Sequence, residues 1–110
     1  IAVIGLQAPL TFLNAENFRI DVFDVLRATP KPGLLVLEAS GILEIDFTAA
    51  QTLLEVIREC RNQDVTLAIA RLESAHTQRA FERFGIYERL PRDCVFRSVD
   101  EAIQALGSKT

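Results

Sequence analysis

The sequence contains few of the residues on which most catalytic and metal-binding sites depend. Its 110 residues include one histidine, two cysteines and neither methionine nor tryptophan. The two cysteines, Cys60 and Cys94, are too few for a disulfide framework, and their spacing matches no metal-binding pattern. The lone histidine, His76, has no acid or nucleophile motif beside it. We therefore expect no catalytic residue, no metal site and no cofactor, and the scarcity of cysteine favours a reducing compartment.

Long apolar stretches are also missing from the chain. None approaches the length of about 18 residues at which a membrane-spanning helix is expected. The net charge of -3 at pH 7 argues against nucleic acid as the main partner. In contrast, a hydrophobic content of 49% is typical of a folded chain, and 110 residues suffice for one domain. Because the sequence starts at Ile1 with neither a methionine nor a basic leader, we expect residues 1–110 to be a single domain excised from a longer protein.

What the sequence does contain is an alternation of apolar, strand-like runs and amphipathic, helix-like segments. The expected strands cover residues 1–6, 10–13, 34–39, 65–70 and 94–96. The expected helices cover residues 15–28, 49–62 and 75–84, and a last helix follows Ser98 and ends at Gly107. An opening hairpin followed by alternating helices and strands predicts an α/β fold, with a central mixed sheet of roughly four to five strands and about four α-helices.

Local signals support these helix boundaries. Asn14 is placed to cap the first helix, and Gly85 is placed to end the third. Ser98 followed by Glu101 forms a capping box at the start of the last helix. Helical phase puts Cys60 on the buried stripe of the second helix, where a small buried hydrophobe is a better interpretation than a reactive thiol.

The first helix carries apolar residues on two sides. Its inward stripe consists of Phe18, Val22, Val25 and Leu26. Helical phase, at about 100° per residue, places Ile20 and Phe23 on the opposite side among polar residues. Two large apolar side chains there are either isolated exposed residues, which are common, or a face that contacts a partner domain or a second copy. We take Ile20 and Phe23 as a candidate interaction face.

The segment from Gly33 to Thr48 predicts a buried strand that ends in a turn and leads into a helix. The turn delivers Asp46 and Thr48 to the start of that helix. Thr48 followed by Gln51 has the pattern of a capping box, and a carboxylate at Asp46 is favoured by the helix dipole. These structural roles alone account for both residues.

This strand-to-helix turn resembles the central turn of STAS domains, which occur in sulfate-permease-type anion transporters and as anti-sigma-factor antagonists. Antagonists carry an Asp-Ser-Ser/Thr-Gly turn whose third residue is the phospho-acceptor. The corresponding residues are Asp46-Phe47-Thr48-Ala49, so Thr48 matches the acceptor, whereas Phe47 and Ala49 depart from the pattern. The resemblance implies a candidate switch turn at Asp46 and Thr48, and a helix N-terminus tolerates the phosphate.

The opening segment resembles the transporter branch more closely. Residues 8–18, APLTFLNAENF, are similar to the Pro-Leu-x-Phe-x-Asn-Ala-x-x-Phe opening of STAS domains at the C-terminus of sulfate-permease (SulP) transporters. The resemblance implies a non-catalytic regulatory module on the cytoplasmic side of the inner membrane, as part of an integral membrane transporter of sulfate or a related anion. Its implied partner is the transmembrane transport domain of the same polypeptide. A second copy of the chain, a cytosolic regulatory protein or a nucleotide are further candidates.

Two alternative functions stay open from the sequence. A free anti-sigma-factor antagonist would be switched by phosphorylation at Thr48. A nucleotide-binding regulatory domain would use Arg79 or Arg83 to contact phosphates, although no glycine-rich phosphate loop accompanies them. Both arginines belong to a locally basic end of the chain, which is either a site for an anionic partner or lipid headgroups, or an ordinary solvated surface. The arginines of this end are Arg71, Arg79, Arg83, Arg89 and Arg92.

Overall fold

A computed structural model describes residues 1–6, 11 and 14–107 of the chain. In chain order the strands are β1 (Ala2–Gly5), β2 (Leu34–Glu38), β3 (Thr66–Ala70) and β4 (Val95–Phe96). The helices are α1 (Ala15–Leu26), α2 (Phe47–Asn62), α3 (Ala75–Arg83), α4 (Ile86–Arg89) and α5 (Val99–Leu106), with a 3-10 turn, η1 (Arg92–Cys94), before β4. The described residues therefore form the α/β fold that the alternating pattern predicts.

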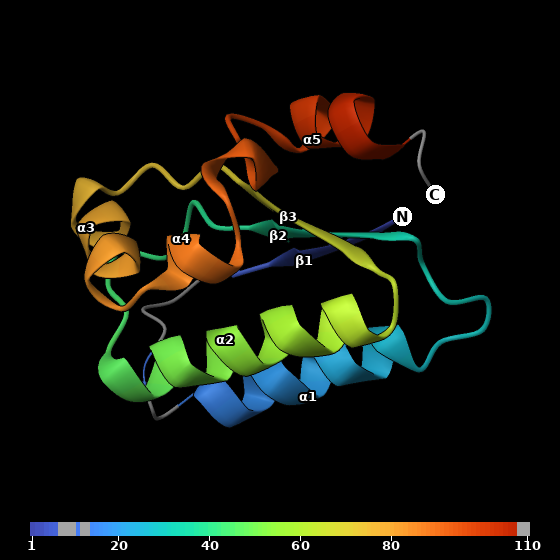
Figure 1. Cartoon of the computed structure of the whole chain (residues 1–110), viewed down its shortest axis with the longest axis horizontal. Coiled ribbons are helices and arrows are strands. Elements are labelled where there is room, and N and C mark those ends of the chain that lie inside the picture. The colour runs from blue at the N-terminus through green and yellow to red at the C-terminus, as the bar shows by residue number, and fades with distance from the viewer. Residues whose placement is uncertain (7–10, 12–13, 108–110) are drawn as a thin grey trace.

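The described strands form one sheet in the order β1-β2-β3-β4, and every neighbouring pair is parallel (Figure 1). In the ladder, Leu35 of β2 lies between Ala2 of β1 and Leu67 of β3. The expectation of a mixed sheet depends on a strand over residues 10–13, and that segment lies almost wholly outside the described residues. The parallel arrangement explains why β2 is apolar on both faces, since both faces are covered by helices.

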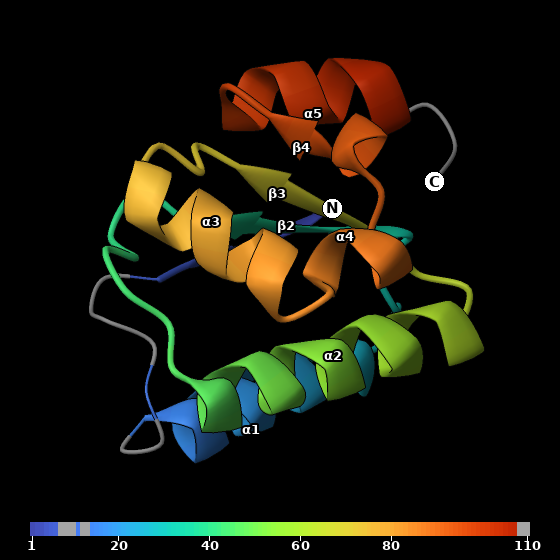
Figure 2. The ribbon, with the colours of Figure 1, turned by 60° about the vertical axis from the view of Figure 1, so that its left-hand side comes forward.

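Helices cover the two faces of the sheet unequally (Figure 2). Helices α1 and α2 lie against one face, where Leu35, Leu37 and Ile69 join the main hydrophobic core. Helix α5 lies against the other face, where Leu34 and Val36 belong to a second and smaller core. Successive residues of β2 thus alternate between the two cores, as the pleat of a strand requires.

The layer beneath α5 combines three alanines with larger apolar residues. Ala68 and Ala70 of β3 are fully buried there, as is Ala102 of α5. Val99 and Ile103 of α5 are half-buried and pack around them. This smaller core closes the side of the sheet opposite α1 and α2.

Most helix ends agree with the capping signals in the sequence. Gly85 has a φ angle of +74° directly after α3, a left-handed conformation that glycine adopts without steric strain. The Ser98 hydroxyl accepts the Glu101 backbone N–H at 3.1 Å and caps α5. Asn14 occupies the N-cap position of α1 as predicted, but its side-chain oxygen accepts the Thr11 backbone N–H at 2.9 Å and makes no capping bond to the helix.

Helix α4 is the element that the sequence pattern misses. Its four residues are too few to show a helical period, and the cap at Gly85 marks an end rather than a new start. Two fixed points hold it: Ile86 is fully buried in the main core, and the Arg61 guanidinium of α2 donates to the Arg89 carbonyl oxygen at 2.7 Å. The short helix is therefore packed beside α2.

Cys60 lies in the main core, as its helical phase predicts. Its side chain is 1% exposed, and burial raises the pKa of the thiol to about 11. Cys94 is half-buried. Within the part of the chain that the structure describes, no three potential ligands among His, Cys, Asp and Glu gather to hold a metal. None of the described helices combines the length and the apolar character needed to cross a bilayer.

Candidate interaction site

The turn between β2 and α2 is closed by its own backbone and by one acidic side chain. The Ile42 N–H donates to the Ala39 carbonyl at 3.1 Å, and the Ser40 N–H donates to the Glu38 carboxylate at 2.7 Å. Hydrogen bonding with Ser40 lowers the pKa of Glu38 below its usual range, against the opposing effect of partial burial. Glu38 is therefore ionised at neutral pH and fixes the start of the turn.

Asp46, rather than Thr48, caps helix α2. Its backbone is extended, and its carboxylate Oδ1 accepts the Ala49 N–H at 2.8 Å. The helix begins at Phe47, so the expected capping box of Thr48 and Gln51 is wrong. Thr48 is the second residue of the helix and is exposed, and its carbonyl accepts the Thr52 hydroxyl at 3.3 Å. Because Asp46 accepts the Ala49 N–H, the Thr48 side chain is not needed as a cap and stays exposed.

Replacing Asp46 with alanine should lower the free energy of unfolding by about 0.5–2 kcal/mol, because the first turn of α2 loses its acceptor. Asp46→Asn is the matched control, since asparagine keeps an oxygen that accepts the Ala49 N–H. Urea denaturation followed by circular dichroism measures both midpoints. An equal loss in the two variants would contradict the capping role and would point to the charge instead.

The N-terminus of α3 supports the turn from the side. Thr77 is fully buried, and its hydroxyl donates to the Ile42 carbonyl at 3.1 Å. The Ser74 hydroxyl caps α3 by accepting the Thr77 N–H at 3.2 Å, and it lies 3.5 Å from the Leu43 carbonyl. These contacts connect two segments about 30 residues apart and hold the turn in one conformation.

Two large apolar side chains on this supported turn face solvent. Leu43 and Phe47 are each 63% exposed. The Phe47 ring lies edge-on to the Phe84 ring, with 6.0 Å between their centroids, and the Arg83 guanidinium lies 4.8 Å from the centre of the Phe84 ring. We call Leu43, Phe47 and Phe84 the turn patch. Exposed apolar residues on a rigid turn are typical of a surface that a partner covers.

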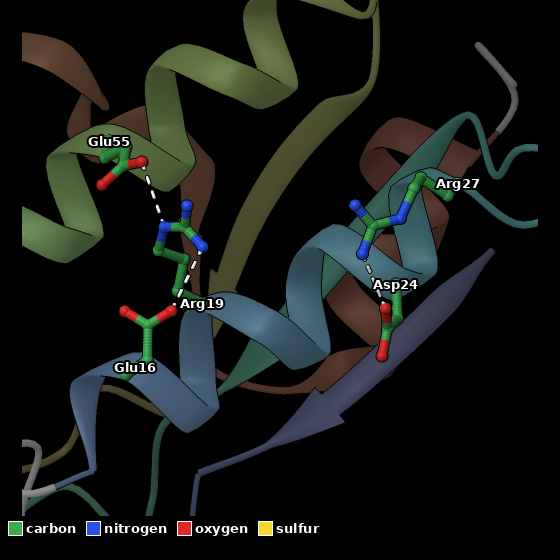
Figure 3. Close-up of polar contacts among 5 residues, drawn as sticks. All are labelled: Glu16, Arg19, Asp24, Arg27 and Glu55. Carbon is green, nitrogen blue, oxygen red and sulfur yellow. Dashed lines mark hydrogen bonds and ion pairs between the residues drawn. The ribbon is translucent and has the colours of Figure 1, made fainter.

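The sequence-predicted pair on α1 is only partly exposed. Ile20 is 43% exposed, whereas Phe23 is half-buried against the main core. Arg19 covers the Phe23 ring at 4.7 Å and also pairs with Glu16 at 3.3 Å and with Glu55 of α2 at 3.2 Å (Figure 3). The expectation that Phe23 lies away from the core is therefore wrong, because this flank of α1 packs beside α2. The interaction face stays a prediction, with Ile20 as its exposed member.

The locally basic end is a mixed surface in the structure. Arg71 pairs with Glu73 at 3.5 Å, and Arg92 pairs with Glu82 at 2.7 Å. Arg79 and Arg83 lie one turn apart on α3, and both are exposed. Their role as nucleotide contacts stays a prediction, because exposed arginines on one helix do not by themselves form a phosphate-binding loop.

Comparison with known protein families supports the pattern of strand, turn and helix. The family model described as the STAS domain matches residues 1–102, which include the turn and every strand that the structure describes. The chain belongs to the STAS domain family. The supported turn at Asp46 and Thr48 thus lies in a STAS domain, as its resemblance to the family implies.

The related proteins are much longer than this STAS domain. A probable sulfate transporter of Mycobacterium tuberculosis is 27% identical over 106 residues, which make up 96% of this chain and 19% of that protein. Probable sulfate transporter 3.5 of Arabidopsis thaliana is 26% identical over 104 residues, which make up 94% of this chain and 16% of that protein. The chain is thus homologous to a segment of these transporters and spans less than one fifth of their length.

Solved structures share its fold. The sulfate transporter family protein of Wolinella succinogenes superposes with a TM-score of 0.84 at 25% identity, over 99% of this chain and 88% of that chain. The STAS domain of a SulP transporter from Vibrio cholerae gives a TM-score of 0.79 at 22% identity, over 98% and 81% of the two chains. The murine Solute Carrier 26 family member A9 anion transporter gives 0.84 at 19% identity, over 96% of this chain and 17% of that one.

Proposed function

We propose that this STAS domain is a non-catalytic interaction module that regulates a SulP-type anion transporter. One observation carries the proposal: relatives that match nearly the whole chain are probable sulfate transporters, and the match occupies less than one fifth of each. On this proposal the domain lies on the cytoplasmic side of the inner membrane, and its partner is the transmembrane transport domain of the same polypeptide. Sulfate or a related anion is selected by that other part.

The geometry supports an interaction role for the turn patch. Leu43 and Phe47 expose apolar surface whose removal from water stabilises a complex by about 25 cal/mol per Å². The turn that carries them is held by Asp46 on one side and by Thr77 on the other. A rigid apolar surface loses little conformational entropy on binding. We infer that the transport domain covers this patch.

A second candidate function is favoured by the position of Thr48. Its side chain is exposed at the second residue of α2, where the helix dipole favours a phosphate and the Asp46 carboxylate already accepts the Ala49 N–H. Phosphorylation there would place two negative charges close to Phe47 and would weaken an apolar contact. The same switch suits a free anti-sigma-factor antagonist, which differs from a transporter module in having no membrane part.

Two measurements on the native gene test the proposal. The first is the coding sequence upstream of Ile1, which we expect to encode successive apolar segments of about 20 residues. The second is radiolabelled sulfate uptake by cells that express the intact protein or the same protein without residues 1–110. Deletion should change the rate of uptake without changing which anions compete, at equal amounts of protein in the membrane. A start codon within a few residues of Ile1, or unchanged uptake, would overturn the proposal.

A further inference from the structure

Three arginines line a hollow between α2 and α4. The hollow has a volume of about 480 Å³ and lies beside the short helix that the sequence pattern misses. Arg58 and Arg61 line it from α2, and Arg89 lines it from α4. The remaining lining residues are Gln51, Leu54, Glu55 and Ile57. We call this hollow the α2–α4 groove.

The charges of the α2–α4 groove are not balanced by the protein itself. Glu55 is the single acid among the described lining residues, and it pairs with Arg19 of α1 at 3.2 Å. Within the part of the chain that the structure describes, neither Arg58 nor Arg89 forms an ion pair with a carboxylate. Four arginines elsewhere do: Arg19, Arg27, Arg71 and Arg92. A local excess of positive charge in a chain of net charge -3 attracts an anion selectively to this place.

One of the three guanidinium groups is already held in place. Arg61 donates one N–H to the Arg89 carbonyl oxygen at 2.7 Å, which leaves it further donors. This bond to the backbone of α4 holds the Arg61 side chain beside Arg89. Leu54 is half-buried and Ile57 is buried beside the three arginines, whose side chains are exposed to solvent.

We propose that the α2–α4 groove binds a phosphate group. Planar guanidinium groups match the oxygens of a phosphate with paired hydrogen bonds, which a lone exposed lysine does not provide. The phosphate is either free in solution or part of a lipid headgroup, since both present the same oxygens to the arginines. The inference uses residues outside the turn patch and does not depend on the transporter proposal.

The test measures binding of two probes to the 110-residue chain. Inorganic phosphate is titrated into ¹⁵N-labelled protein while backbone amide shifts are followed by NMR. Vesicles of phosphatidylglycerol, with vesicles of phosphatidylcholine as the neutral control, are sedimented with the same protein. The variant Arg58→Gln with Arg89→Gln removes two side-chain charges but keeps the Arg89 carbonyl that Arg61 contacts. Arg79→Gln with Arg83→Gln removes the same charge from α3 and is the matched control.

We expect phosphate to shift the amides of α2 and α4 and the groove variant to bind at least about tenfold more weakly, because charge-assisted hydrogen bonds are lost. The control variant should bind like the unchanged protein. Sedimentation with phosphatidylglycerol that the groove variant abolishes assigns the phosphate to a lipid, whereas binding of inorganic phosphate alone assigns it to a solute. Equal weakening in both variants, or binding of neither probe, would overturn the site. Circular dichroism confirms that the variants are folded.

Discussion

Replacing Leu43 and Phe47 together with glutamate should, on the proposed function, weaken binding of this domain to a transmembrane transport domain by at least about 30-fold. The few residues that dominate an interface contribute about 2 kcal/mol or more on truncation, which corresponds to about that factor. The two glutamates would also bring charges into a surface that excludes water. The affinity is measured by expressing the domain and the membrane part as separate chains and following their association in nanodiscs.

The domain should stay folded in this variant. Both side chains are 63% exposed, so neither substitution opens a cavity in the core. The turn beneath them is held by the bonds from Thr77 to the Ile42 carbonyl and from Ala49 to Asp46, which the substitutions leave in place. An unchanged thermal midpoint in the isolated domain would show that a loss of binding comes from the surface.

Ile20→Glu is the informative comparison because it makes the same kind of change on α1. Ile20 is 43% exposed, whereas its predicted companion Phe23 is half-buried against the main core, where a charge would destabilise the domain. If Ile20→Glu weakens the association and the turn variant does not, the interface lies on α1 instead of on the turn patch. Normal association of the turn variant would contradict our assignment of the turn patch.

Phe81→Ala should lower the free energy of unfolding by about 3–5 kcal/mol, the usual cost of removing a buried aromatic ring. Phe81 is 1% exposed, and its ring centroid lies 5.6 Å from that of Tyr87. The free energy of unfolding of a native protein is only about 5–15 kcal/mol, so this single change removes a large share of it. Urea denaturation should show a lower midpoint with an unchanged slope.

Phe84→Ala is the matched control, because it makes the same chemical change one turn further along the chain. Phe84 is half-buried and contacts Phe47 at the surface, so its loss should cost markedly less than the loss of Phe81. Equal losses of unfolding free energy in the two variants would show that the buried Phe81 contributes no more to stability than the half-buried Phe84. A larger loss at Phe84 would mean that the turn patch is part of the core rather than an accessible surface.

Much of the fold follows from periodicity and capping. The continuous apolar run at β2 indicated a strand covered on both faces, and the stripe that includes Cys60 indicated the buried face of α2. Gly85 and Ser98 marked helix ends correctly. Helix α4 was not predictable in this way, because four residues show no period and their helical state depends on burying Ile86 in the core.

The candidate site was predictable in its location but not in its parts. The turn itself was visible in the sequence, yet the cap was assigned to Thr48 with Gln51, and only the backbone geometry shows that Asp46 caps α2. Phe47 looked like a departure from a motif, and its exposure depends on how α3 supports the turn. Phe23 was misplaced because its phase on α1 does not reveal that α2 packs along that flank.

The unequal cover of the sheet has a consequence for how the domain opens. Lifting α5 would uncover the smaller core, which includes Leu34, Val36 and two alanines of β3, whereas separating α1 and α2 would uncover the larger main core. Partial opening at α5 therefore needs less free energy than global unfolding, and its amide hydrogens should exchange with solvent before those of β2. The sheet face beneath α5 is thus the part of this domain that a thermal fluctuation can expose while the remainder stays native.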